Sequence, residues 1–371
     1  MENPTKESFV ITTRIMQIIG WYPPEKKSKF RLLQAYSLYF LLLVMVNVLV
    51  VVKMFLKKGY DDAMQVVYIG ETIWYAFKVM PFLGGNDRIK NCISYFEGAE
   101  FRPQDDTEKE ILNNSAFLCQ VISKFYIVSI ICAEILVSIP RLFSDEYALP
   151  VPLWLPYSVT SNSMIFYVTY FYVSIAVVYA GFSTSLLDPL IGGLVFQAIS
   201  QIKILKHRIQ NPQNPKSNST SIFQKLTECV ELHNAILNFV KEYEKCFSWT
   251  IFNQFLGTTS ELCFICIAIA KVPIASVDTI KYTCFFFVVN CQVLFYCYFG
   301  TLLYEESDSL VTAIYVSQWY EYPIESQKLL LTLMERSKEP LLLSAEKLLD
   351  LTLDTFIKIL KRSYSLVTLL K

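Results

Sequence analysis

The sequence predicts an all-α polytopic membrane protein with seven transmembrane helices. Of its 371 residues, 53% are hydrophobic and only 18% are charged, and the mean hydropathy is +0.38. Soluble domains carry about 25% charged residues, so this chain has too few to cover several water-facing domains. It also contains apolar stretches that reach the roughly 20 residues needed to cross a hydrocarbon layer about 30 Å thick.

Six of these stretches are long enough to span a bilayer. Residues 32–52 and 282–304 contain no charged side chain. Residues 163–187 are also free of charge and follow a proline-rich loop that contains Trp154. The other three hold isolated charges and cover residues 64–83, 116–140 and 246–275.

The basic residues between the spans predict the orientation. With a cytoplasmic N-terminus, the cytoplasmic segments hold about three times as many Lys and Arg residues as the outer ones. With seven spans the C-terminus is then extracellular. Residues 1–31 are charged and lack the short apolar core of a secretory signal, so we expect the first span to direct insertion.

Apolar residues at helical spacing continue beyond the fourth, fifth and sixth spans. We expect these extensions to pack together as a cytoplasmic base shared between subunits. The predicted division of the chain is a cytoplasmic N-terminal segment (1–31), spans one to four (32–196), cytoplasmic helical extensions with a loop (197–245), spans five and six (246–304), cytoplasmic anchor helices (305–348) and a pore-lining seventh helix (349–371).

The seventh helix carries its charges at steps of three and four residues, which places them on one face: Asp350, Asp354, Lys358, Lys361 and Arg362. Charges at the middle of a bilayer cost several kcal/mol each, so this face predicts contact with an aqueous passage. The last turns are apolar. Leu366 and Leu370 share a face beside Leu369, and copies from several subunits would form a constriction that dewets when narrow. The alternative is an amphipathic helix on the inner membrane surface, and the position of the C-terminus separates the two.

Other classes of function find little support. The 33 basic and 33 acidic residues balance, which argues against nucleic acid as a partner. Two histidines are too few for a His-rich metal site, and Cys263 and Cys266 lie in an apolar helix without further ligands. We therefore predict no enzymatic activity, no cofactor and no metal.

Two strings resemble the insect odorant receptor family. They are the ending SYSLVTLLK (Ser363–Lys371) and the fifth-span sequence NQFLGTTSELCFICIAIA (Asn253–Ala270). The resemblance implies an odorant-gated, non-selective cation channel, assembled as a tetramer around a central pore of seventh helices. It places Leu366 and Leu370 at the constriction, and we include the neighbouring Ser363 and Leu369 among the pore residues.

The same resemblance implies a partner. Tuning subunits of this family assemble with a shared co-receptor, which carries a larger insertion between spans four and five than residues 203–245 can hold. The chain therefore looks like a tuning subunit of a heterotetramer in the plasma membrane of a sensory neuron dendrite. Its expected partners are the co-receptor, a small apolar volatile, lipid and permeating cations.

The resemblance places the odorant pocket in the outer half of spans two to six, where aromatic walls with few hydroxyls suit a small apolar ligand. The predicted ligand-binding residues are Tyr68, Glu71, Thr72 and Tyr75 on span two, Ser129, Cys132, Ile135 and Leu136 on span three, Met164, Tyr167, Phe171 and Ser174 on span four, and Thr258, Thr259 and Leu262 on span five, with Phe285, Phe286 and Asn290 on span six.

Charged residues within the spans face either the bundle or a water-filled cavity. Glu71, Glu134 and Glu261 map to the outer half, and Lys78 and Lys124 to the inner half. Two interpretations stay open: structural pairing, or an electronegative outer cavity that favours cations.

Three other classes of membrane protein predict different sequence features. A G-protein-coupled chemoreceptor would place its N-terminus outside and carry Asp-Arg-Tyr and Asn-Pro-x-x-Tyr motifs. A transporter would show repeated halves and interrupted helices, and an intramembrane enzyme would need a paired nucleophile and base or a metal cluster. None of these features is found, which favours a channel subunit.

Overall fold

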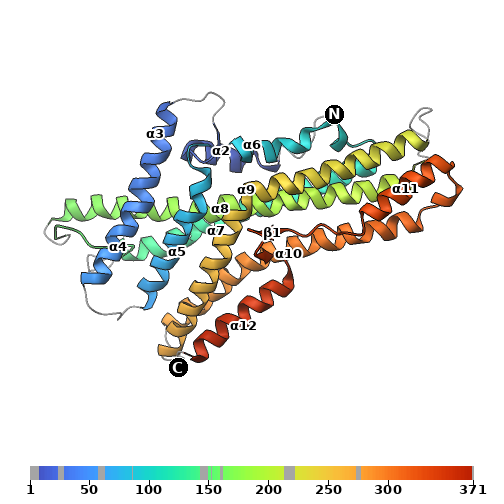
Figure 1. Cartoon of the computed structure of the whole chain (residues 1–371). Helices are drawn as coiled ribbons and strands as arrows, with labels where there is room; N and C mark the ends of the chain where they lie inside the picture. The colour runs from blue at the N-terminus through green and yellow to red at the C-terminus, as the bar shows by residue number, and fades with distance from the viewer. Residues whose placement is uncertain are drawn as a thin grey trace.

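The computed structural model describes residues 8–23, 29–56, 63–85, 87–142, 149–151, 153–158, 162–212, 222–272 and 277–369. These residues are overwhelmingly helical, with a single two-stranded antiparallel pair. The chain is therefore all-α, and Figure 1 shows long helices that diverge at one end and run side by side at the other.

The first membrane-crossing segment is a continuous helix from Lys29 to Leu56. It comprises α3 (Lys29–Leu38), a π-helical turn η1 (Tyr39–Val44) and α4 (Met45–Leu56). A short helix, α2 (Val10–Ile19), precedes it. The second segment, α5 (Ala63–Val79), ends in the 3-10 turn η2 (Met80–Phe82), and α6 (Asp87–Ser94) follows with the turns η3 (Tyr95–Glu97) and η4 (Ala99–Phe101).

Four much longer helices follow: α7 (Asp106–Leu142), α8 (Ser163–Gln210), α9 (Ile222–Lys271) and α10 (Val277–Val316). Asp105 caps α7, because its Oδ1 accepts from the Glu108 N–H at 2.8 Å, and Asn162 caps α8 in the same way toward Met164 at 2.9 Å. A rise of about 1.5 Å per residue makes each helix longer than the bilayer core is thick. Their surplus length forms a packed helical base, and its place in the cytoplasm stays a prediction.

The chain ends with η6 (Trp319–Glu321), α11 (Ile324–Arg336), the strands β1 (Ser344–Ala345) and β2 (Leu349–Asp350), and α12 (Leu353–Leu369). The seventh helix thus begins at Leu353 rather than at the predicted Leu349. Asp350 pairs with Ser344 in the strand pair, so it does not belong to the charged face of the helix.

Five helices in the described part of the chain are long and apolar enough to cross a membrane: Lys29–Leu56, Asp106–Ala133, Ser163–Gln210, Ile222–Ile269 and Tyr282–Val316. The remaining two of the seven are the shorter α5 and the charged α12. Both pack against α9. Their short length and their charges lower their hydropathy, and the packing against α9 decides their place in the bundle.

A buried ion pair joins α7 and α8 in the helical base. The Arg208 guanidinium near the end of α8 donates to both carboxylate oxygens of Glu108 at the start of α7, each at 2.8 Å, and the Glu108 side chain is 1% exposed. It also donates to the Arg102 carbonyl at 2.8 Å. His207, the residue before Arg208 on α8, lies with its ring Nε2 2.9 Å from the carboxylate of Asp105. Burial raises the pKa of Asp105, but hydrogen bonds from the Glu108 backbone and His207 outweigh it, so the pKa of Asp105 is lowered overall.

Candidate functional site

Four helices meet at an ion pair in the middle of the bundle. Lys78 near the end of α5 pairs with Asp188 of α8, and both side chains are 1% exposed. The Lys78 ammonium also donates to Oε1 of Gln254 on α9 at 2.9 Å, and the Tyr296 hydroxyl on α10 donates to Asp188 at 2.5 Å. Unpaired buried charges are strongly destabilising, so this cluster fixes α5, α8, α9 and α10 relative to one another.

The polar cluster continues along α9. The Gln254 amide donates to Oε1 of Gln292 at 3.0 Å and to the Thr258 hydroxyl at 3.3 Å. On the facing side of α5, the Tyr75 hydroxyl donates to Glu71. Glu261, only 4% exposed, lies within electrostatic range of both Glu71 and Lys78. The contact between α5 and α9 therefore buries several polar side chains within the bundle.

Helix α5 is tied to its neighbours on two sides. Toward α9, the Trp74 indole N–H donates to the Ser260 hydroxyl at 3.0 Å, and this close approach needs Gly257, where an added Cβ would lie 2.7 Å from the Trp74 ring. Toward α4, the Thr72 hydroxyl donates to the side-chain oxygen of Asn47 at 2.5 Å. The Asn47 amide in turn donates to the Thr72 carbonyl at 3.3 Å.

A small cavity lies beside the Thr72–Asn47 pair. It has a volume of about 20 Å³ and is enclosed by aliphatic side chains of η1, α4 and α8 and by Val151 of the preceding loop, with Asn47 and Thr72 as its polar members. This volume holds about one water molecule. A larger ligand would therefore have to separate α5 from α4 and α8.

The structure brings five of the predicted ligand-binding residues into the bundle. Glu71, Tyr75, Thr258 and Leu262 lie on α5 and α9, which pack against each other, and Thr72 lines the small cavity. Tyr75, Thr258 and Leu262 are at most 9% exposed. Thr259 uses its hydroxyl within its own helix, on the Phe255 carbonyl at 2.8 Å.

Other predicted residues lie elsewhere. Met164, Tyr167 and Phe171 on α8 are 74%, 49% and 60% exposed, so they point out of the subunit. Ser129, Cys132 and Ile135 on α7 are also exposed, whereas the Ser174 hydroxyl is buried. The side chains of Tyr68, Leu136 and Glu134 lie outside the described part of the structure. The structure does not gather these α7 and α8 residues with the α5–α9 group, and their role in binding stays a prediction.

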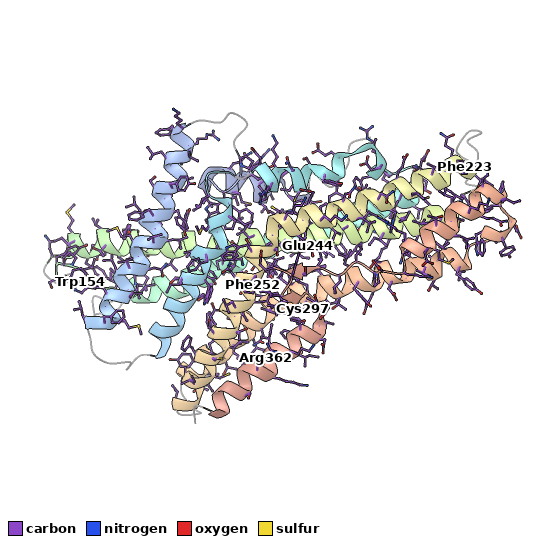
Figure 2. All side chains as sticks on the ribbon, in the orientation of Figure 1. Trp154, Phe223, Glu244, Phe252, Cys297 and Arg362 are labelled. Carbon is purple, nitrogen blue, oxygen red and sulfur yellow. The ribbon has the colours of Figure 1, made fainter. Side chains whose placement is uncertain are left out.

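The last helix has two unlike faces. It packs against α9 and α10, and Figure 2 places Arg362 on it. Its charged side chains are on the outside: Lys358 and Asp354 pair at 2.5 Å while 62% and 70% exposed, and Lys361 and Arg362 are exposed as well. Ser363 is 3% exposed and turned into the subunit. The side chains of Leu366 and Leu369, and all of Leu370, lie outside the described residues.

Sequence reasoning did not single out Asp188, Gln254, Tyr296 or Asn47. The signal for Asp188 was available, since it is an acidic residue next to Pro189 in a helix that stays apolar for more than thirty residues. Once Lys78 is known to be intramembrane, an acidic partner at similar depth is the first residue to look for.

Seven membrane-crossing helices, a packed helical base and an amphipathic last helix define a polytopic membrane protein. The sequence profile of the family described as 7tm Odorant receptor matches residues 60–364. The chain belongs to the insect odorant receptor family, as its resemblance predicts, and is a receptor rather than an enzyme.

Similar proteins cover nearly the whole chain. Odorant receptor 33a of Drosophila melanogaster is 22% identical over 96% of this chain and 93% of its own length. Odorant receptor Or1 of Anopheles gambiae is 20% identical over 85% of this chain and 82% of its own length. The solved structure of the olfactory receptor OR5 from Machilis hrabei in complex with eugenol matches with a TM-score of 0.83 at 15% identity, covering 99% of this chain and 98% of that one. This last match confirms the seven-helix fold.

Proposed function

We propose that this odorant receptor is the odorant-binding (tuning) subunit of a ligand-gated, non-selective cation channel, in which it assembles with a co-receptor as a heterotetramer. The observation that carries the proposal is the exposed charged face of α12. Asp354, Lys358 and Arg362 lie outside the packed bundle on a helix whose other side packs against α9 and α10. Such a face is unfavourable against lipid and stable against water, so α12 lines an aqueous pore between subunits.

In this arrangement the N-terminus is cytoplasmic and the C-terminus is extracellular, in the plasma membrane of a sensory neuron dendrite. Leu366, Leu369 and Leu370 then form the apolar constriction at the outer end of α12. Ser363 faces its own subunit and supports the helix rather than contacting ions.

The assignment as a tuning subunit rests on the connection between α8 and α9. Helix α8 ends at Gln210 and α9 begins at Ile222, so residues 211–221 are the whole connection. The insertion expected of a co-receptor has no room there.

The ligand site is the region around α5, and the ligand is a small apolar volatile. Thr72 and Asn47 give it one polar anchor in an aliphatic cavity. The cavity has room for about one water molecule, so ligand binding favours a state in which α5 has shifted and the cavity is larger. Because α5 packs against α9, and α9 against α12, a shift of α5 can reach the pore helix. Ligand then opens the channel through its higher affinity for the shifted state.

Currents from cells expressing the chain with and without a co-receptor, recorded against an odorant panel, test this function. Thr72→Val leaves the Asn47 side-chain oxygen without the donor hydroxyl of Thr72. One lost buried hydrogen bond corresponds to about a ten-fold higher half-maximal odorant concentration. Leu370→Ser removes an apolar constriction and raises the basal current. The matched control is Thr332→Val on α11, whose hydroxyl donates to the Lys328 carbonyl of its own helix at 2.9 Å. It leaves both quantities unchanged.

Two results would contradict the proposal. One is an epitope fused after Lys371 that stays inaccessible in intact cells, because α12 would then not cross the membrane. The other is an odorant response that persists unchanged with α12 deleted, since ions would then flow elsewhere.

A further inference from the structure

A second, much larger cavity lies at the other end of the first two membrane segments. It has a volume of about 660 Å³ and lies between α2, the beginning of α3 and the turn that follows η2. Figure 1 shows α2 beside the end of α5, next to α6 and away from the C-terminal end of α12. The predicted orientation places this cavity at the cytoplasmic surface of the membrane.

Glycines at left-handed positions build the cavity. Gly20, with φ +92°, ends α2, and an added Cβ there would lie 2.4 Å from Cβ of Ala35. At Gly85, with φ +77°, an added Cβ would lie 2.6 Å from the backbone of Pro23. Between them, Trp21 is fully buried and its indole N–H donates to the Tyr179 hydroxyl of α8 at 3.0 Å. The residues beneath the cavity are therefore held firmly by the bundle.

Three basic side chains line the cavity. Arg14, Lys29 and Arg31 all line it and are exposed, and none of them forms an ion pair within the described part of the chain. The amides of Gln17 and Gln34 add hydrogen-bond donors. Tyr22 also lines the cavity. Burial raises the pKa of Tyr22, and the nearby carboxylate of Glu97 raises it further. Three cations and two amides around one concavity match a multiply charged phosphate group.

Exposed apolar side chains surround this basic cavity. On α2, Ile11 and Ile18 are 45% and 72% exposed and share a helical face with Arg14. On α3, which continues into the first membrane segment, Phe30 and Leu33 are 75% and 67% exposed. A short helix with an apolar face and a basic residue on it is the pattern of a helix lying in the membrane interface.

We propose that this cavity binds the phosphorylated headgroup of an anionic membrane lipid, whose acyl chains run along the exposed face of α3. The apolar residues decide between a lipid and a soluble phosphate, because a soluble anion would use the same three charges and gain nothing from Ile18, Phe30 or Leu33. The cytoplasmic leaflet is the one that carries anionic lipids. This site is separate from the odorant site and the pore, and its test uses neither odorant nor current.

The test measures lipid binding by the detergent-purified full chain. Fluorescent phosphatidylinositol bisphosphate in mixed micelles is titrated against wild type and against the triple variant Arg14→Gln, Lys29→Gln, Arg31→Gln. Each lost charge near the membrane surface weakens binding about five-fold, so the triple variant is expected to raise Kd about a hundred-fold and each single variant about five-fold. The matched control has the same charge loss at exposed sites far from the cavity: Lys109→Gln, Lys241→Gln and Lys328→Gln.

Three further measurements make the proposal falsifiable. Fluorescent phosphatidylcholine should bind weakly and equally to all variants. Soluble inositol trisphosphate should compete at least ten-fold less well than the lipid, and Ile18→Ser should weaken binding of the lipid but not of the soluble headgroup. Equal loss in the two triple variants, or a soluble headgroup that binds as tightly as the lipid, would overturn the proposal. If the triple variant has a lower melting temperature than wild type, the Kd values of the single variants are compared instead. An unchanged Kd for the lipid in all three single variants would refute the proposal.

Discussion

The ion pair between Lys78 and Asp188 offers the sharpest test of how the bundle is held together. Lys78→Met keeps the length and apolar stem of the side chain but removes its charge. The Asp188 carboxylate is then 1% exposed, and the Tyr296 hydroxyl is the hydrogen-bond donor that remains to it among the described residues. Removing one member of a buried pair costs about 3–5 kcal/mol. Since about 1.4 kcal/mol is a factor of ten, the unfolding equilibrium constant should rise by two to more than three orders of magnitude.

The double variant Lys78→Met, Asp188→Leu removes both charges of the pair, so neither is left buried without its partner. It should recover most of that loss and lie within about 1–2 kcal/mol of wild type. Lys358→Met is the matched control. Its partner Asp354 is 70% exposed, and surface pairs contribute about 0–1 kcal/mol. The assay is reversible denaturant unfolding of the purified protein in detergent, followed by tryptophan fluorescence. A single variant within about 1 kcal/mol of wild type, or a double variant as unstable as the single one, would refute the reasoning.

Three further predictions concern packing, the helical base and pH. Gly257→Ala forces a methyl group into the Trp74 ring and should destabilise the protein by about 1–3 kcal/mol. The control is Gly70→Ala, where an added Cβ meets nothing within 4 Å, and it should be neutral or stabilising by up to about 1 kcal/mol. Equal melting temperatures of the two variants would contradict this prediction. Arg208→Ala leaves the buried Glu108 carboxylate without its partner and should lower the free energy of unfolding by about 3–5 kcal/mol. Lys245→Ala, whose partner Glu242 is exposed, should lower it by less than about 1 kcal/mol. Thermal unfolding measures both variants, and similar losses of stability would disprove the prediction. Burial lowers the pKa of His233, and the charge of Arg336 lowers it further, so the folded state binds this proton less tightly than the unfolded chain. The stability that neutral His233 contributes is present above the unfolded value of about 6.5 and is lost as pH falls below it. His233→Gln should flatten that part of the stability profile, and an unchanged slope would exclude His233 as its cause.

Hydropathy and charge spacing were enough to predict the class of fold. The apolar stretches of spans one, three, four, five and six reappear as the five long apolar helices, since burying roughly twenty backbone amides in hydrocarbon leaves the helix as the available structure. The helical extension beyond span four was equally readable, because Ile199, Ile202 and Leu205 repeat at helical spacing and are all buried in the base.

The outward and inward faces of the membrane helices could not be predicted in the same way. Met164 and Phe171 looked like pocket residues, yet they point out of the subunit. Lipid is as apolar as the interior of a helix bundle, so the hydrophobic pattern of a membrane helix does not say which side packs against protein. Close packing at small residues decides which side faces protein. Gly257 is an example, because its missing side chain lets the ring of Trp74 pack against α9.

Composition and spacing by themselves determined that this chain crosses a membrane many times and ends in a helix with a charged face, because the cost of exposing charge to hydrocarbon is a property of each segment alone. Only the tertiary structure decided that Lys78 meets Asp188, 110 positions along the chain, and that Asp350 joins a strand pair instead of the last helix. It alone showed that Arg14, Lys29 and Arg31 share a cavity. Pairings of this kind depend on which helices become neighbours, and that is settled by the packing of the whole bundle.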